Sequence, residues 1–305
     1  MDDITSLFLP CDKEKDAIRV VYNIQSISYW QDAWMRLKKN KLAIAGLVFL
    51  FFLLLMAIFG PMLTGYTYYE THLHLKNHRP SSAFWFGTDE LGRDLFTRIW
   101  WGARISLFVG ISAAIIDMLI GVFYGAFSGL IGGKIDEIMM RSADILYSLP
   151  YLLVVILLMV VMGPGIITII IAMTITGWIN MSRIVRAQIL QLKELDFILA
   201  AKSLGASQCR ILIKHLIPNT IGSIITTMTL TIPAAIFTEA FLSFLGLGVQ
   251  APIASWGTMA SDCLSALRYY PWRLFFPATF ISLTMLSFNL IGDGLRDALD
   301  PRLRS

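Results

Sequence analysis

The sequence predicts an all-α polytopic membrane protein, and three observations lead to this fold class. Of the 305 residues, 56% are hydrophobic and only 15% are charged, whereas about a quarter of the residues of a soluble domain are charged. The apolar residues gather in long uncharged runs, and a helix needs about 20 such residues to cross a bilayer. A backbone inside a bilayer must satisfy its own hydrogen bonds, so we expect these runs to be helices.

The apolar runs predict six transmembrane helices. The runs are 42–59, 105–133, 145–182, 216–238 and 274–292. The third run is too long for one helix, and the Gly-Pro-Gly sequence at 163–165 divides it into two spans joined by a tight turn. Six spans place both termini on the same side of the membrane.

The distribution of positive charge predicts the orientation of the spans. With six spans, 18 of the 25 Lys and Arg lie on the side of the termini and 7 on the other side. The seven are Lys76, Arg79, Arg93, Arg98, Arg104, Arg268 and Arg273. Cytoplasmic segments carry an excess of Lys and Arg, so we expect both termini in the cytoplasm. A charge arranged in this way does not indicate nucleic-acid binding.

The spans divide the chain into five parts. These are a cytoplasmic N-terminal segment at 1–40, a first transmembrane helix at 41–60, an external loop at 61–104, a transmembrane core at 105–293 and a cytoplasmic tail at 294–305. Trp30, Trp34 and Leu37 recur at helical spacing beside Lys and Arg. This pattern predicts either a short helix lying in the membrane interface or an ordinary segment next to the first span.

A polar segment at 194–218, between the fourth and fifth spans, is the most informative part of the chain. A membrane protein needs no charged segment of this length merely to reverse its direction. Its pattern of Ala200-Ala201, Gly205 and Pro218 resembles the EAA loop of ATP-binding-cassette (ABC) importer permeases. The resemblance implies a short cytoplasmic helix that docks into a groove on an ATPase subunit. Leu199 stands where that family has the glutamate that names the loop.

The residue types of this coupling loop suit a helix that contacts a partner. The two small alanines let two backbones approach closely, and Gly205 is suited to end the helix with a positive φ. Lys202 and Arg210 provide cationic edges that would meet carboxylates. Pro218 suits the first turn of the next helix, where its missing N–H costs little. The alternative is a helical turn that merely connects two spans.

Further motifs extend the resemblance over residues 28–303. They are Phe86-Gly-Thr-Asp-Glu-Leu-Gly-Arg-Asp94, Gly102-Ala-Arg-Ile-Ser106, Leu245-Gly-Leu-Gly-Val249 and the run at 289–301. Together and in this order they resemble the C-type permease subunits of peptide importers, in the dipeptide, oligopeptide and nickel permease family. The resemblance implies a type I ABC importer transmembrane domain in the bacterial cytoplasmic (inner) membrane.

The same resemblance implies partners. They are a B-type permease subunit, two ATP-binding-cassette ATPase subunits, an external solute-binding protein and a peptide substrate, in a lipid bilayer. The chain has no G-x-x-x-x-G-K-[ST] motif, so we expect a subunit without catalysis or cofactor that depends on separate ATPases. Nickel or another small solute carried by the same architecture is an alternative cargo.

The external motif and two charges within spans complete the candidate site residues. Gly87, Asp89, Glu90, Gly92, Arg93 and Asp94 combine paired charges with glycines that permit a tight turn. Asp117 and Glu239 lie within predicted spans, where ionisable groups usually face a protein interior or water. We expect them on the pathway or at a gate, or in structural roles. Proton carriage by these two residues in a secondary transporter is the less favoured alternative.

Other charged groups favour structural interpretations. We expect Asp144, which lies close to Arg141, to form an ion pair within its helix or with another helix, and we expect Arg183 and Arg186 to reach the lipid headgroups. His72, His74 and His78 would suit zinc or nickel, but no cysteine or carboxylate nearby completes a set, so we expect no metal site. The motifs of intramembrane aspartyl proteases and zinc metalloproteases are absent.

Overall fold

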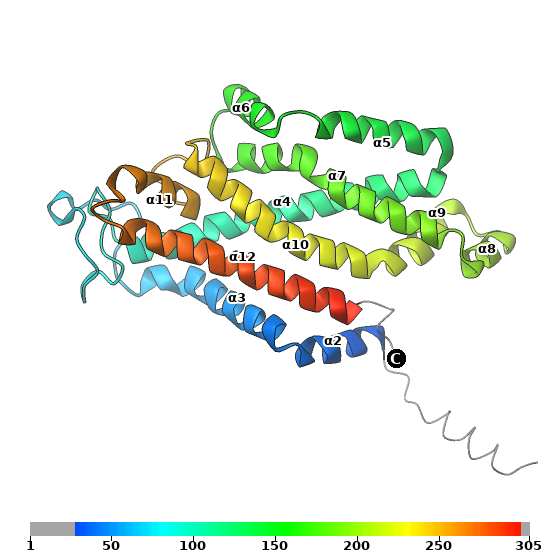
Figure 1. Ribbon diagram of the computed structural model, residues 1–305, viewed down its shortest axis with the longest axis horizontal. Coiled ribbons are helices and arrows are strands. Elements are labelled where there is room, and N and C mark those ends of the chain that lie inside the picture. The colour runs from blue at the N-terminus through cyan, green and yellow to red at the C-terminus, as the bar shows by residue number, and fades with distance from the viewer. Residues whose placement is uncertain (1–27, 300–305) are drawn as a thin grey trace, which may run out of the picture.

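The computed structural model describes residues 28–299, and this part of the chain is helical with no β-strand. The predictions made for residues 1–27 and 300–305 lie outside the described residues. Five long helices lie side by side along the molecule (Figure 1). They are α3 (Lys41–Phe59), α4 (Leu95–Ile131), α7 (Ile166–Leu192), α10 (Ile217–Phe244) and α12 (Trp272–Leu299).

Shorter helices and turns connect or flank these long helices. They are α2 (Tyr29–Lys39), α5 (Gly133–Tyr147), α6 (Tyr151–Met162), α8 (Asp196–Ser203), α9 (Gln208–Ile211), α11 (Trp256–Asp262), the π-helical η4 (Leu212–Leu216), and the 3-10 turns η2 (Gly60–Met62), η3 (Leu73–Leu75) and η5 (Leu264–Ala266). Within residues 28–299, five helices are long and apolar enough to cross a membrane, or six if the bent pair α5 and α6 is one span.

The predicted start of the second span was wrong. It was placed at residue 105, but α4 begins at Leu95. The carboxylate of Asp94 caps this helix by accepting the N–H of Thr97 at 2.9 Å. Arg98 and Arg104, which suggested a loop, find partners from other segments, since Arg104 donates to the carbonyl of Ala57 at 2.5 Å.

The predicted third span is also differently built. Helix α5 begins at Gly133 rather than at residue 145, and α6 follows after a 78° bend. Pro150 causes the break because it lacks an N–H and disfavours helical conformation in Leu149. At the C-terminal side, α12 continues to Leu299, beyond the predicted end at 292.

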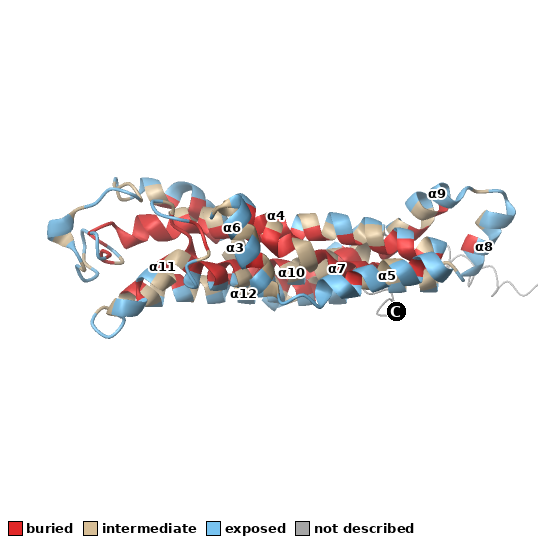
Figure 2. Ribbon diagram, turned by 90° about the horizontal axis from the view of Figure 1, so that it is seen from above, coloured by how far each residue is buried: buried red, intermediate tan, exposed pale blue. Residues whose placement is uncertain are grey.

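Close packing of α4 against α7 forms the centre of the bundle. Gly121, Gly125 and Gly129 recur every fourth residue on α4 and face α7. A Cβ atom added at Gly125 would collide with the backbone of Ser182. Small residues bring helix backbones together in this way when no water drives their association. Buried residues accordingly run along the middle of the molecule, while most of α5 and α8 is exposed (Figure 2).

The bundle has two distinct ends. One carries α11 and the long connection from α3 to α4, and the other carries α8 and α9 (Figure 1). We refer to them as the α11 end and the α8 end. Helix α2 lies at the α8 end, where its buried Ala33 and Leu37 pack against α12, while Trp30 and Trp34 are exposed.

Candidate functional site: the loop at the α8 end and the charged groups of the bundle

Helix α8 is closed by a specific backbone motif. The N–H of Ala206 donates to the carbonyl of Ala201 at 3.0 Å, and the N–H of Gly205 donates to the carbonyl of Lys202 at 2.9 Å. Gly205 has φ +82°. These features define a Schellman motif, which satisfies the last carbonyls of a helix. The prediction that Gly205 ends this helix with a positive φ is therefore confirmed.

The loop is attached to the bundle through its inner face. Ile198 of α8 is fully buried, in one cluster with Ile211 and Leu216. Ile189 of α7 and Ile224 of α10 belong to the same cluster. Ser207 caps α9 by accepting the N–H of Arg210 at 3.3 Å. The buried side of α8 thus belongs to the same apolar cluster as residues of α7 and α10.

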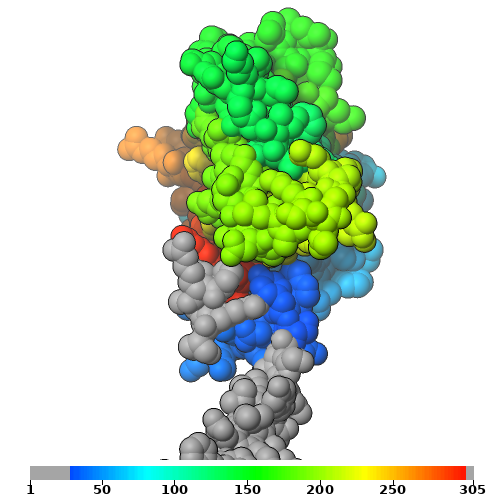
Figure 3. Space-filling model, turned by 90° about the vertical axis from the view of Figure 1, so that its right-hand side faces the viewer, coloured from blue at the N-terminus to red at the C-terminus, as the bar shows by residue number. Residues whose placement is uncertain are grey.

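Helix α8 and its C-cap expose several large apolar side chains. Phe197 is 43% exposed and Leu199 is 45% exposed on different sides of the helix, and the C-cap Leu204 is 89% exposed. Ala200 is exposed, whereas Ala201 is half-buried. Exposed apolar side chains gathered in one segment are typical of an interaction site. The segment around α8 lies in the middle of the α8 end in Figure 3, where it is yellow-green.

The basic residues of the loop and its proline are exposed on the surface of the chain. Lys202, Arg210 and Lys214 are exposed. Pro218 is exposed in the first turn of α10, where no helical hydrogen bond needs its nitrogen. The predicted loop residues thus lie on α8, the turn that follows it, α9 and the first turn of α10, and Leu199 is exposed.

Helices α5 and α7 are joined by ion pairs that correct one expectation. Arg186 binds Asp136 through two bonds, Nε to Oδ1 at 2.5 Å and Nη2 to Oδ2 at 2.6 Å. Arg183 Nη2 lies 2.6 Å from Asp144 Oδ1. The expectation that both arginines reach the lipid headgroups is wrong, since carboxylates of α5 hold them. Asp144 forms an interhelical pair with Arg183, one of the two expected kinds, while the nearby Arg141 pairs with Glu137 instead. Sequence reasoning missed Asp136.

Glu239 belongs to a buried hydrogen-bond network. Its side chain is inaccessible to solvent and accepts the hydroxyls of Ser106 at 2.9 Å and Ser243 at 2.8 Å. The N–H of Trp256 donates to Ser106 Oγ at 3.2 Å, and Ser255 contacts Ser243. The network connects α4, α10 and α11. The hydrogen bonds of Glu239 are therefore made within this chain.

Asp117 lies in a different environment. It is 5% exposed in the middle of α4, opposite Gly177 of α7. Any side chain at position 177 would collide with the carboxyl group. Among the described residues, neither Asp117 Oδ1 nor the hydroxyl of Tyr151 has a hydrogen-bond partner. Burial of a carboxyl group without hydrogen-bond partners costs free energy. Asp117 differs in this respect from Glu239, whose carboxylate accepts two hydrogen bonds.

The external motif folds into the predicted tight turn. Gly87 and Gly92 have φ values of +79° and +72°. The carboxylate of Asp89 accepts the N–H groups of Leu91 and Arg93 at 2.9 Å each. It also pairs with Arg93 Nε at 2.6 Å. The paired charges and glycines therefore form one hydrogen-bonded turn.

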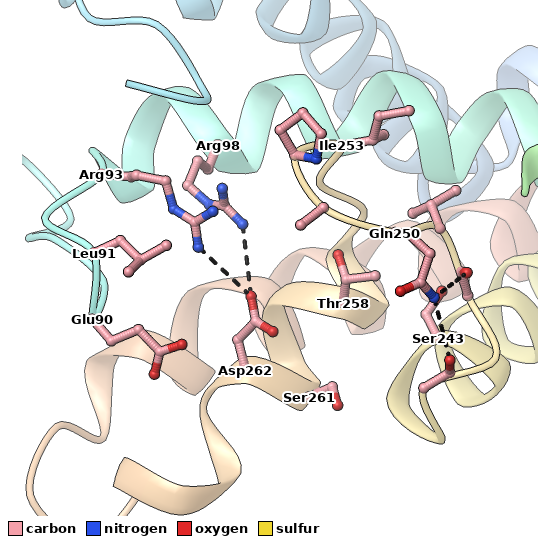
Figure 4. Close-up of a pocket in the computed structure, with 15 residues that line it drawn as sticks. Glu90, Leu91, Arg93, Arg98, Ser243, Gln250, Ile253, Thr258, Ser261 and Asp262 are labelled. Carbon is pink, nitrogen blue, oxygen red and sulfur yellow. Dashed lines mark hydrogen bonds and ion pairs between the residues drawn. The ribbon is translucent and has the colours of Figure 1, made fainter. Parts of the chain in front are cut away.

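Two buried arginines extend this turn toward α11. Asp262 Oδ2 lies 3.9 Å from Arg93 Nη2 and 3.7 Å from Arg98 Nη2 (Figure 4). Glu90 pairs with the buried Arg273 of α12 at 3.4 Å. Burial raises the pKa of the Asp262 carboxyl, an effect that the two guanidiniums oppose. Local sequence spacing contains no signal for these pairs, so sequence reasoning missed Arg98, Asp262 and Arg273.

A cavity of about 280 Å³ adjoins these charges, between the turn and the loop at 246–253.

The histidines of the external loop form no metal centre in the described part of the chain, where no group of three or more His, Cys, Asp or Glu is arranged to hold an ion. His78 Nδ1 instead lies 2.9 Å from the carbonyl oxygen of Arg79.

Two comparisons with known families explain this arrangement. Residues 121–305 match the family described as binding-protein-dependent transport system inner membrane component. Residues 28–80 match the N-terminal transmembrane domain of oligopeptide transport permease C. The chain belongs to this family of ABC importer permeases. It is therefore a multi-pass protein of the inner membrane.

Individual relatives support the assignment over most of the chain. The chain is 63% identical over 280 residues to the oligopeptide transport system permease protein OppC of Bacillus subtilis, covering 92% of each protein. It is 64% identical to the dipeptide transport system permease protein DppC of the same organism, covering 92% of this chain and 88% of that one. OppC of Escherichia coli K12 is 44% identical over 283 residues, covering 92% and 94%.

A solved structure confirms the fold. The MetNI methionine ABC transporter, in an inward-facing conformation, matches with a TM-score of 0.55 at 17% identity. The match covers 65% of this permease and 94% of the MetNI chain. The predicted type I importer fold is thus confirmed.

Proposed function

We propose that this permease carries dipeptides or oligopeptides across the inner membrane, in a pathway formed with a B-type permease partner. The support is the high identity to OppC and DppC of Bacillus subtilis over most of the chain. These two relatives are named for different peptide lengths at nearly equal identity, so peptides as a class are the cargo we propose. Nickel or another small solute is the alternative for the same architecture.

The single observation that carries the mechanism is the exposed apolar surface of α8 and its C-cap. Phe197 and Leu204 are exposed, while Ile198 is buried in a cluster that also contains residues of α7 and α10. We propose that this surface docks into a groove of one of two ATP-binding-cassette ATPase subunits. ATP binding would then move α8, and the buried anchor would pass the movement to the spans. The outcome is alternating access, a shift between two populated states.

The proposed orientation places the α8 end in the cytoplasm. The exposed cations Lys202, Arg210 and Lys214 support it, because cytoplasmic segments of membrane proteins are rich in Lys and Arg. The α11 end then faces outward, where an external solute-binding protein would deliver peptide. In this arrangement Glu239 supports the outer gate by holding α11 to α4 and α10, rather than by touching cargo.

Peptide uptake by the assembled complex tests this function. The two permeases and two ATPases are reconstituted in liposomes with the binding protein, and uptake of labelled peptide is followed with ATP. We expect ATP-dependent uptake that a protonophore leaves unchanged, in wild type and in Asp117→Asn alike. Uptake driven by a proton gradient without ATP, and lost in Asp117→Asn, would favour the secondary transporter. Uptake of nickel but not of peptides would establish the alternative cargo.

A further inference from the structure

A second cavity, of about 590 Å³, opens between α2, α7, α10 and α12 toward the α8 end. Its volume lies within the range of pockets that hold small ligands, about 300–1,000 Å³. Neither Asp117 nor Glu239 lines it. The inference drawn from this cavity rests on the proposed transport of peptides and names the chain's own contacts with them.

The lining of this cavity is polar but almost uncharged. Gln188 and Gln191 lie on one face of α7, three residues apart. Asn219, Ser223 and Thr227 lie on one face of α10 at four-residue spacing. Among the described residues of the lining, the one charged side chain is that of Arg296, which is exposed.

This lining is unusual for surfaces that meet lipid. Acyl chains offer no hydrogen bonds, so polar groups in spans normally turn toward protein or water. Ser223 and Thr227 lie within a helix that is apolar enough to cross the membrane. The polar face they form with Gln188 therefore indicates a hydrated or ligand-bearing space rather than a lipid contact.

The chemistry of the lining matches one feature that all peptides share. A glutamine or asparagine amide offers the donors and acceptors of a peptide unit, and a hydroxyl offers one donor and two acceptor lone pairs. Uncharged partners bind a main chain without selecting acidic or basic side chains. We propose that this cavity binds the main chain of the transported peptide through Gln188, Gln191, Ser223 and Thr227.

Photo-crosslinking tests this proposal in the assembled complex. A tripeptide carrying a benzophenone side chain is delivered by the binding protein with ATP, irradiated, and the cross-linked residues are identified by mass spectrometry. We expect cross-links in 188–191 and 219–227 that require ATP and binding protein. Cross-links confined to other segments of the permeases, during normal uptake of the same peptide, would overturn the proposal. Retention of phospholipid in the cavity without peptide cross-links would overturn it as well.

Substitutions provide a second, independent measurement. Ser223→Trp fills the cavity and should lower the uptake rate at least about tenfold, because overpacking a confined site opposes binding. Gln188→Leu removes hydrogen bonds of ordinary strength and should lower it by roughly threefold to tenfold. Ala278→Trp, at an exposed alanine of α12 outside the cavity, is the matched control for added bulk and should transport normally.

The outcomes separate this inference from the function on which it rests. Wild-type rates in both Ser223→Trp and Gln188→Leu would overturn the cavity proposal alone. If Ser223→Trp fails to assemble, which co-purification reveals, the cross-linking result decides. A wild-type complex that imports no peptide with ATP would instead overturn the proposed function and this inference together.

Discussion

The N–H of Ala206 donates to the carbonyl of Ala201 at 3.0 Å, and this bond closes the C-terminal end of α8. The turn is fixed by backbone geometry at Gly205 and by the burial of Ile198. None of these features uses the exposed side chains. The exposed side chains of α8 can therefore be replaced without loss of the loop's fold.

The exposed side chain of Leu204 provides the first prediction. Leu204→Asp should weaken binding of the ATPase subunits about tenfold or more, because a charge replaces an apolar group at the centre of the proposed contact. The fold should be unaffected, since Leu204 is 89% exposed. The affinity of purified ATPase subunits for the permease pair in nanodiscs measures the effect. Leu204→Met is the control, and equal affinities for the two variants would remove Leu204 from the interface.

Two natural cysteines provide a test of the orientation. Cys209 on α9 is exposed and Cys263 is buried. Burial also raises the pKa of the Cys263 thiol to about 11, which keeps it unreactive near neutral pH. In a Cys11→Ser background without ATPase subunits, an impermeant maleimide should label Cys209 in inside-out vesicles and not in right-side-out vesicles. The reverse result would invert the proposed topology.

The pair of Arg186 and Asp136 should contribute to the stability of the bundle. Asp136→Ala should lower the free energy of unfolding by about 1–2 kcal/mol, a discounted value because Arg186 is about a third exposed. The exchange of Asp136→Arg with Arg186→Asp should recover part of the loss. Thermal unfolding of the detergent-solubilised chain measures both. An unchanged stability in Asp136→Ala would show that packing alone, and not the ion pair, holds α5 against α7.

The raised pKa of Asp262 predicts a dependence of stability on pH. A carboxyl whose pKa is higher in the folded state than its ordinary 3.8 takes up protons on folding. The folded state is therefore favoured by this group at low pH and loses that advantage as pH rises through the raised pKa. Compared with Asp262→Asn, the wild type should lose thermal stability as pH rises above about 4. Parallel pH profiles of the two proteins would contradict this.

Much of this architecture follows from short-range sequence patterns. Uncharged runs predict spans because the bilayer excludes other backbone structures. Gly205 and the turn at Asp89 and Arg93 were predictable because their partners lie within five residues. The α8 helix was predictable as a unit, but the outward position of Ala200 rather than Ala201 depends on how Ile198 packs in three dimensions.

Long-range contacts explain what the sequence could not predict. Hydropathy placed the start of the second span ten residues too late, because Arg98 and Arg104 are paired by distant segments. The partners Arg186 and Asp136 are separated by 50 residues. The polar cavity depends on four helices, and no single segment contains its signal.

We propose that α8 couples ATP hydrolysis to transport, and the variant Gly205→Val is the sharpest test of this role. Valine at φ +82° is strained, and no atom of the described chain lies within 4 Å of a Cβ built at this position, so within the permease strain rather than a clash is the cause of the effect. Gly205→Asn tolerates this φ and is the control. Uptake of labelled peptide and peptide-stimulated ATPase activity are measured in proteoliposomes with equal amounts of assembled complex. We predict loss of both in Gly205→Val and near-normal values in Gly205→Asn. Normal uptake by Gly205→Val, together with normal uptake by Ala200→Trp and Ala201→Trp, would show that the loop is only a connection and contradict the account.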